Sequence, residues 1–272
     1  MPLSVSSQTT PSENFSKMKF KILPSDTLLP HFSIQEDELG KRMANFQEFQ
    51  NTIQDFTFYT SSSVVYSSKI EGVEIELDSY LKHKLLGVKF LVDYTKKADD
   101  LFEAYSFARS RILNEKSILE AHKLITKNFL RASERGRWRV SPMFVMGGER
   151  ILYVATNPEQ VKGELVKFFA DLSLLLRTEL NIRETFFYAS LLHLIFLNIH
   201  PLNDGNGRTA RLLEKWFLAS KLGDKAWQIP SEKYYYHNKN EYYHNLQRIG
   251  FEYDTMDYTK ALPFVNMLVA CV

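Results

Sequence analysis

The chain has 272 residues, of which 44% are hydrophobic and 24% charged, values typical of a globular protein and not of a disordered one. Its 34 basic and 32 acidic residues leave a net charge of +2, which gives no electrostatic case for nucleic-acid binding. A single cysteine excludes a disulfide framework and a cysteine-based metal site. We therefore expect a cytoplasmic protein with one core, or with one core and an appended subdomain.

Neither a targeting signal nor a membrane span is expected. Residues 1–20 begin with a run rich in Ser and Thr that lacks the charged and apolar regions of a signal peptide, so they predict a disordered tail. The longest apolar-looking stretch, residues 189–199, contains His193 and Asn198 and is too short to cross a bilayer. We expect no membrane association.

Helical periodicity dominates the rest of the chain. Apolar residues recur at i, i+3, i+4 and i+7 in residues 45–65 (continuing up to Gly72), 77–91, 99–113, 117–130, 158–180, 183–199 and 208–222. Gly72 and Gly223 stand where a glycine commonly follows a helix.

Two segments break this pattern. In residues 139–155, β-branched and large apolar residues flank Gly147–Gly148, which predicts a short hairpin. The polar, tyrosine-rich run 231–243 predicts a loop that leads into a last pair of helices. The predicted fold class is therefore all-α with one short β-hairpin.

The stretch HPLNDGNGRTAR, residues 200–211, combines a turn with unusual chemistry. Pro201 disfavours helical backbone at His200, so the preceding helix should end near residue 199. Asp204–Gly205 and Asn206–Gly207 are turn signals, and a new helix follows them. The free amides and the dipole at the start of that helix can bind an anion.

The charged residues of this stretch sharpen the prediction. Arg208 lies in the first helical turn, where the dipole disfavours a cation, and Arg211 shares its face three residues on. A bound polyphosphate would compensate both. Asp204 could hold Mg²⁺, which takes one or two carboxylates plus phosphate oxygens, and His200 is the natural general base. Each residue alone is usually structural, and only their ordered combination predicts a site; the rival P-loop pattern is absent.

The stretch resembles the motif HPFx(D/E)GN(G/K)RxxR of the Fic family. The matching positions are His200, Pro201, Asp204, Gly205, Asn206, Gly207, Arg208 and Arg211. Leu202 stands where the family usually has Phe, a side chain that anchors the loop in the core. His193 and Phe196 match the H-x-x-F pattern upstream, and the hairpin at 139–155 takes the place of the family's flap. EYYHNL, residues 241–246, resembles a segment whose second tyrosine, here Tyr243, lines the adenine pocket.

This resemblance implies a mainly helical Fic fold, with an N-terminal helical region at 21–115 and a Fic core at 116–272. It also implies AMP transfer from ATP, with Mg²⁺, to a Tyr, Thr or Ser hydroxyl of a target protein, and it allows a homodimer. The roles implied are general base for His200, Mg²⁺ ligand for Asp204, phosphate binding for Gly205, Asn206 and Gly207, and binding of the phosphate tail for Arg208 and Arg211. The Doc branch has Lys at the position of Gly207, so adenylyl transfer is favoured over phosphotransfer.

A second signature lies upstream, in YSSKIEGVEIE, residues 66–76. Ser67 and Glu71 are four residues apart on one helix face, and Gly72 should end that helix. Glu71 would then face the negative end of the helix dipole, and taken alone it is more often a solvated residue partly offset by Lys69. The pattern, however, resembles the inhibitory motif [S/T]xxxE[G/N] of the second class of Fic proteins. That resemblance implies autoinhibition in cis, with Glu71 holding Arg211.

Other functions remain open at this point. The same site could act as a phosphodiester hydrolase that removes AMP, with Glu71 positioning a water molecule. Alternatively, the chain could be a non-enzymatic module whose flap captures a peptide by strand addition. A nucleic-acid role is a distant third, because no winged-helix-like segment follows the core and the charge is balanced.

Overall fold

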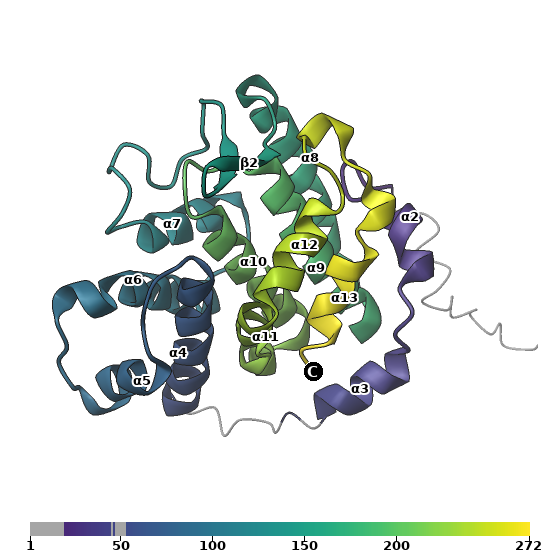
Figure 1. Ribbon diagram of the computed structural model, residues 1–272. Coiled ribbons are helices and arrows are strands. Elements are labelled where there is room, and N and C mark those ends of the chain that lie inside the picture. Colours follow the sequence, from purple (N-terminus) through teal and green to yellow (C-terminus); the bar gives the residue numbers. More distant parts are fainter. Residues whose placement is uncertain (1–18, 45, 47–52) are drawn as a thin grey trace, which may run out of the picture.

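The computed structural model describes residues 19–44, 46 and 53–272, so all but the last two residues of the predicted tail lie outside the described part. The described residues form twelve α-helices and one two-stranded sheet (Figure 1). The helices are α2 (Ser25–Leu28), α3 (Glu36–Ala44), α4 (Ile53–Ile70), α5 (Leu77–Leu86), α6 (Val92–Arg109), α7 (Glu115–Ile125), α8 (Pro158–Arg177), α9 (Ile182–Ile199), α10 (Asn206–Leu222), α11 (Ser231–His237), α12 (Lys239–Gln247) and α13 (Leu262–Val269). Short 3₁₀ helices lie at Leu29–His31, Asp224–Gln228, Tyr253–Thr255 and Tyr258–Lys260. The predicted fold class, mainly helical with a small hairpin, is confirmed.

Helix α9 is the centre of the core. Every residue from Glu184 to Ile199 is buried, as expected of a helix that is apolar on nearly all sides. Its start is fixed by a capping box, in which the side chains of Asn181 and Glu184 satisfy each other's backbone amides. Helices α3, α8, α10 and α13 pack around it (Figure 1). The end of α9 is therefore held in the buried core of the molecule.

Helix α4 brings the upstream signature to the core. It packs against α5, α6 and α11, at the lower left in Figure 1. The described part of the helix starts at Ile53, and Phe46 lies in a bend. The predicted start of the helix at residue 45, with residues 47–52, lies outside the described part. At its other end Gly72 has a left-handed φ of 79°, which confirms the predicted stop.

The largest error of the sequence prediction concerns residues 231–243. They form helices α11 and α12, which meet at Asn238, and not a loop. The reason is a buried aromatic face that the polar composition concealed. Tyr235 and Tyr242 are each 1% exposed, and their rings pack 5.6 and 5.9 Å from the ring of His193 on α9. Tertiary packing thus decides a segment that its own propensities leave ambiguous.

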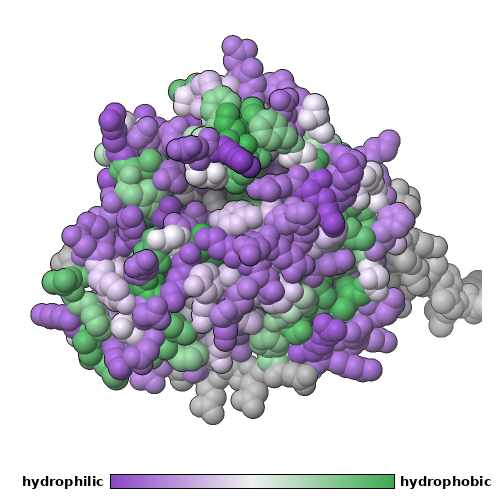
Figure 2. Space-filling view, in the orientation of Figure 1, coloured by the Kyte–Doolittle hydropathy of each residue, from purple (hydrophilic) through white to green (hydrophobic). Residues whose placement is uncertain are grey.

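The predicted hairpin consists of strands β1 (Phe144–Gly147) and β2 (Arg150–Val154), which pair antiparallel with a bulge between Val145 and Met146. Beyond the turn, the Val154 amide donates to the Phe251 carbonyl, at 2.9 Å, which anchors β2 to the neighbouring loop. Apolar side chains gather over the hairpin at the top of the molecule (Figure 2), where Phe144, Met146 and Ile151 are about half exposed. Among the described residues, no helix is long and apolar enough to cross a membrane.

Candidate active site

The loop that follows α9 begins with a strained residue. His200 adopts left-handed backbone angles, φ 49° and ψ 57°, and is the one non-glycine residue with positive φ in the described part of the chain. Such a conformation costs about 1–3 kcal/mol and persists only where the surroundings fix it. The helix ends at Ile199, as Pro201 predicts.

The next residues are braced by their own side chains and by the core. Leu202, which replaces the usual Phe, is fully buried. The Asn206 carboxamide accepts from the Leu202 amide (3.0 Å) and donates to the Leu202 carbonyl (2.8 Å). The Asn206 side chain, which was expected at the phosphate, is therefore used by the loop. At the start of α10, backbone amides remain for a ligand, because the first amides of a helix have no intrahelical partner.

A buried histidine of α7 holds the middle of the loop. His122 Nδ1 accepts from the Gly136 amide at 2.9 Å, and its Nε2 lies 3.0 Å from the Asp204 carbonyl. Because a backbone amide only donates, the proton of the ring must be on Nε2, which donates to Asp204. Burial lowers the pKa of His122 to about 4, so the ring is neutral near pH 7.

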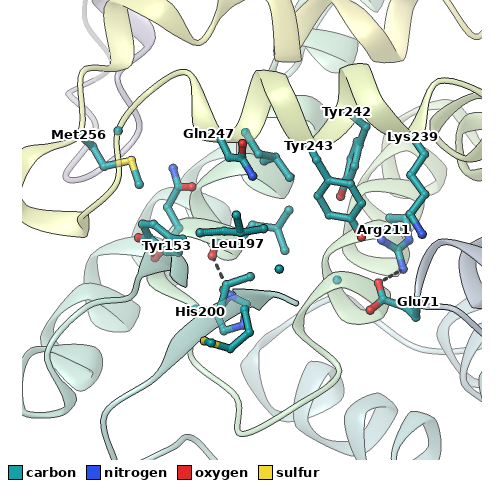
Figure 3. A pocket seen from close by; sticks show the side chains of 18 residues that line it. Glu71, Tyr153, Leu197, His200, Arg211, Lys239, Tyr242, Tyr243, Gln247 and Met256 are labelled. Carbon is teal, nitrogen blue, oxygen red and sulfur yellow. Dashed lines mark hydrogen bonds and ion pairs between the residues drawn. The ribbon is translucent and has the colours of Figure 1, made fainter. Parts of the chain in front are cut away.

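A cavity of about 430 Å³ lies between the hairpin, the end of α9, the start of α10, α12 and the end of α4 (Figure 3). Of the residues predicted for the site, it is lined by His200, Gly207, Arg211, Tyr243 and Glu71. Its size is in the range of small-molecule sites. Residues from both sequence signatures thus meet around one cavity.

His200 presents an unprotonated nitrogen in this cavity. Its Nδ1 lies 3.2 Å from the Leu197 carbonyl, which can only accept, so Nδ1 carries the ring proton (Figure 3). Burial lowers the pKa of His200 to about 4. The imidazole is therefore neutral near pH 7, and the lone pair of Nε2 can take a proton from a substrate.

Glu71 and Arg211 form the predicted ion pair between the two signatures. One Glu71 oxygen lies 2.7 Å from Arg211 Nη2 (Figure 3). Arg211 Nε donates to the Ser67 hydroxyl at 2.9 Å. The side chains are 27% and 1% exposed, respectively. Burial raises the pKa of Glu71, but the charges of Arg211, Arg208 and Lys239 and the hydrogen bond from Arg211 together outweigh it and leave that pKa below its usual value.

Gly207 allows this carboxylate to rest on the first turn of α10. A Cβ at Gly207 would lie 2.5 Å from Glu71 Oε1, which is closer than atoms can approach. Glu71 therefore lies at the positive end of the α10 dipole, where an anionic ligand would also be stabilised.

The other predicted site residues do not line the cavity: Ser67, Gly72, Asp204, Gly205, Asn206 and Arg208. Arg208 does not share the position of Arg211: its guanidinium carbon lies 4.0 Å from the ring centre of Phe129, and its Nε has no hydrogen-bond partner. The Asp204 carboxylate accepts from the Gly205 amide, and the side chain is 54% exposed. The described residues contain no group of three acidic, His or Cys side chains that could hold a metal by themselves.

The sequence analysis missed Lys239 and Arg139. Lys239 lines the cavity from α12, with its Nζ 5.8 Å from the ring centre of Tyr243. Its helical spacing to Tyr242 and Tyr243 was the available signal, but this segment was predicted as a loop. Arg139 lies beneath the strained loop and donates to the His200 carbonyl at 2.6 Å.

Comparison with known proteins places this site in a family. Residues 112–218 match the Fic/DOC family. This part of the chain is therefore a Fic/DOC domain. The matched residues include the hairpin and the loop 200–211. Helices α11 to α13 and the upstream signature at residues 66–76 lie outside the match.

Relatives agree with this assignment. Protein adenylyltransferase Fic of Drosophila erecta is 26% identical over 212 residues, which are 76% of this chain but only 39% of that protein. A Fic family protein from Desulfovibrio desulfuricans superposes with a TM-score of 0.72 at 21% identity, over 93% of this chain and 73% of that one. A Fic domain-containing protein from Bacteroides thetaiotaomicron gives 0.66 at 19% identity, over 87% and 92% of the two chains. These two structures share the Fic fold.

Proposed function

We propose that this Fic protein is an adenylyltransferase that transfers AMP from ATP to a hydroxyl side chain of a target protein, and that Glu71 keeps it inactive. One observation carries the proposal: a neutral His200 and the cation Arg211 line the same cavity, and Glu71 holds Arg211 there. The name of the Drosophila relative supports the reaction type, although the chain spans only 39% of the length of that protein.

The reaction needs a base on one side of the α-phosphate and anion binding on the other. The target hydroxyl oxygen attacks the α-phosphorus, its proton passes to His200 Nε2, and the bond to the β-phosphate oxygen breaks, releasing pyrophosphate. The Gly207 amide and Arg211 bind phosphate oxygens. Tyr243, 5.3 Å from the ring of Tyr242, offers an aromatic face to the adenine.

Mg²⁺ fits the loop only together with the nucleotide. Asp204 supplies a single, half-exposed carboxylate, which is the donor set that Mg²⁺ takes when phosphates provide further oxygens. Bound there, the ion would neutralise negative charge on the phosphates. The rest of the chemistry falls to His200, the start of α10 and Arg211.

The target segment would lie along the hairpin. The sheet has only these two strands among the described residues. The outer edge of β2 is already paired at Val154 with Phe251, so an extended chain would pair with the remaining main-chain groups of the outer edges. Backbone pairing makes little demand on the sequence of the target. Tyr, Thr or Ser could then present its hydroxyl to His200.

The test uses Glu71→Gly protein, a mixture of candidate targets, and ATP labelled on either the α- or the γ-phosphate. Label from the α-phosphate alone should enter protein, and Glu71→Gly combined with His200→Ala should give none above background. Transfer of the γ-label would mean phosphotransfer. Absence of both labels, in a protein shown to bind ATP, would refute the proposed function.

A hydrolase that removes AMP is the second candidate, because Glu71 lines the cavity together with His200 and could hold a water molecule there. Release of AMP from a modified target by the parent chain, lost in Glu71→Gly, would favour this reaction.

A further inference from the structure

Arg139 is buried between the hairpin and the loop that carries His200. Its side chain donates four hydrogen bonds, and every acceptor is a backbone carbonyl. The acceptors are His200 (2.6 Å), Ser141 (2.8 Å), Thr156 (2.6 Å) and Ile199 (3.3 Å). The Arg139 residue is 2% exposed, and its own amide donates to the Pro201 carbonyl at 2.8 Å.

A fully buried arginine normally faces a carboxylate, because burying an unpaired charge is costly. Arg139 has none within ion-pair distance among the described residues. Its charge instead lies at the end of α9, beside the carbonyls of Ile199 and His200, where the helix dipole is negative and favours a cation. The charge is therefore stabilised by backbone carbonyls alone, and these carbonyls belong to the hairpin and to the loop of His200, which points to a role beyond packing.

The four acceptors fall into two pairs. Ile199 and His200 end α9 and begin the strained turn, whereas Ser141 and Thr156 stand just before β1 and just after β2. One planar guanidinium therefore joins both ends of the hairpin to the peptide of His200. The fork geometry of arginine matters, because lysine could not reach carbonyls on two sides at once.

We propose that Arg139 is a positioning residue, which fixes His200 in its left-handed conformation and sets the hairpin at a constant distance from it. This inference rests on the proposed function, since it assumes that His200 takes the proton of a hydroxyl held along the hairpin. The contacts of Arg139 would then determine whether the hydroxyl of the bound segment lies within reach of His200.

The charge of Arg139 has a separate, measurable effect. Burial is the main cause of the low pKa of His200, and the charge of Arg139 lowers that pKa further. The charges of Glu71 and Asp204 raise it. Arg139→Gln keeps donors for carbonyls but removes the charge, so the pKa of His200 should rise. Because the base must be unprotonated, the acid limb of the pH–rate profile should move to higher pH.

The kinetic test compares Arg139→Gln, Arg139→Lys and the control Arg137→Gln, an exposed arginine two residues away, all in the Glu71→Gly background. Misplacement of reacting groups by about 1 Å costs ~10²-fold in rate. We therefore expect kcat to fall by at least about tenfold in both Arg139 variants, with KM for ATP changed less than twofold. The acid limb should shift in Arg139→Gln, stay in Arg139→Lys, and be unaffected in Arg137→Gln.

A second measurement does not depend on activity. NMR titration of labelled His200 in the full chain should show its pKa raised in Arg139→Gln and unchanged in Arg137→Gln. If Glu71→Gly transfers no label but this titration shifts, the proposed function fails and the coupling of Arg139 to His200 stands. If kcat and the titration both match the control, or if Arg139→Lys retains full kcat, the positioning role is refuted. If Arg139→Gln does not fold, Arg139→Lys is compared with the control alone, and its kcat decides the test.

Discussion

Replacing Glu71 by glycine should activate this protein, whereas removing a residue of a functional site usually lowers activity. In the structure Arg211 Nη2 donates to the Glu71 carboxylate at 2.7 Å. A hydrogen bond between charged groups contributes about 1.5–3 kcal/mol net. Because each 1.4 kcal/mol is a factor of ten, Arg211 would be free to bind phosphate in only about 1–10% of molecules. Glu71→Gly should therefore raise the rate of transfer roughly ten- to a hundredfold.

The assay is the initial rate of α-label incorporation at a fixed ATP concentration well below KM. Glu71→Gln separates charge from size, since it keeps the side-chain length but weakens the bond, and should give part of the gain. Glu74→Gln, at an exposed carboxylate three residues away, should change nothing. A Glu71→Gly protein that binds ATP yet is no more active than the parent would refute autoinhibition, although nucleotide transfer itself could survive that result.

Three further outcomes are expected in the Glu71→Gly background. His200→Ala should bind ATP nearly normally and lose at least ~10²-fold in transfer, and undiminished labelling would remove its role as base. Asp204→Ala should need more Mg²⁺ for the same rate of labelling, so an unchanged Mg²⁺ dependence would mean that it is not the metal ligand. Ile151→Pro removes a main-chain donor from the hairpin, so it should reduce labelling of targets and leave ATP binding, measured by calorimetry, unchanged. The control Ile151→Ala retains the donor and should label targets normally. Equal loss of labelling and of ATP binding would mean that the hairpin is only structural.

The active-site loop could be predicted from sequence because its residues are contiguous. A proline, two glycines and the following helical periodicity are enough to place a turn between two helices, and the structure has that turn between Ile199 and Asn206. The pairing of Glu71 with Arg211 was predicted as well, from the resemblance of residues 66–76 to the inhibitory motif, and it agrees with helix dipoles that disfavour both charges. That pair is present in the structure.

What could not be predicted depends on tertiary packing. Arg208 and Arg211 are three residues apart, but the Arg208 guanidinium packs on the ring of Phe129, a residue distant in the sequence, and does not line the cavity. Lys239 and Tyr243 belong to a helix whose buried tyrosines pack on α9, a contact that local composition does not reveal. Arg139 precedes the hairpin by a few residues and could not be told from an ordinary loop arginine in the sequence. Its acceptors are backbone carbonyls, which every residue has, so no sequence pattern marks them.

The central claim is that Glu71 and the phosphates of ATP compete for Arg211, and a double-mutant cycle tests it most directly. The rate of α-label transfer is measured for the parent, Glu71→Gly, Arg211→Ala and the double variant. The account predicts that Arg211→Ala changes the slow parent rate little, because Arg211 is already held, and abolishes the roughly ten- to hundredfold gain in the Glu71→Gly background. The same fold-loss on Arg211→Ala in both backgrounds would contradict the claim, because it would mean that Arg211 acts independently of Glu71.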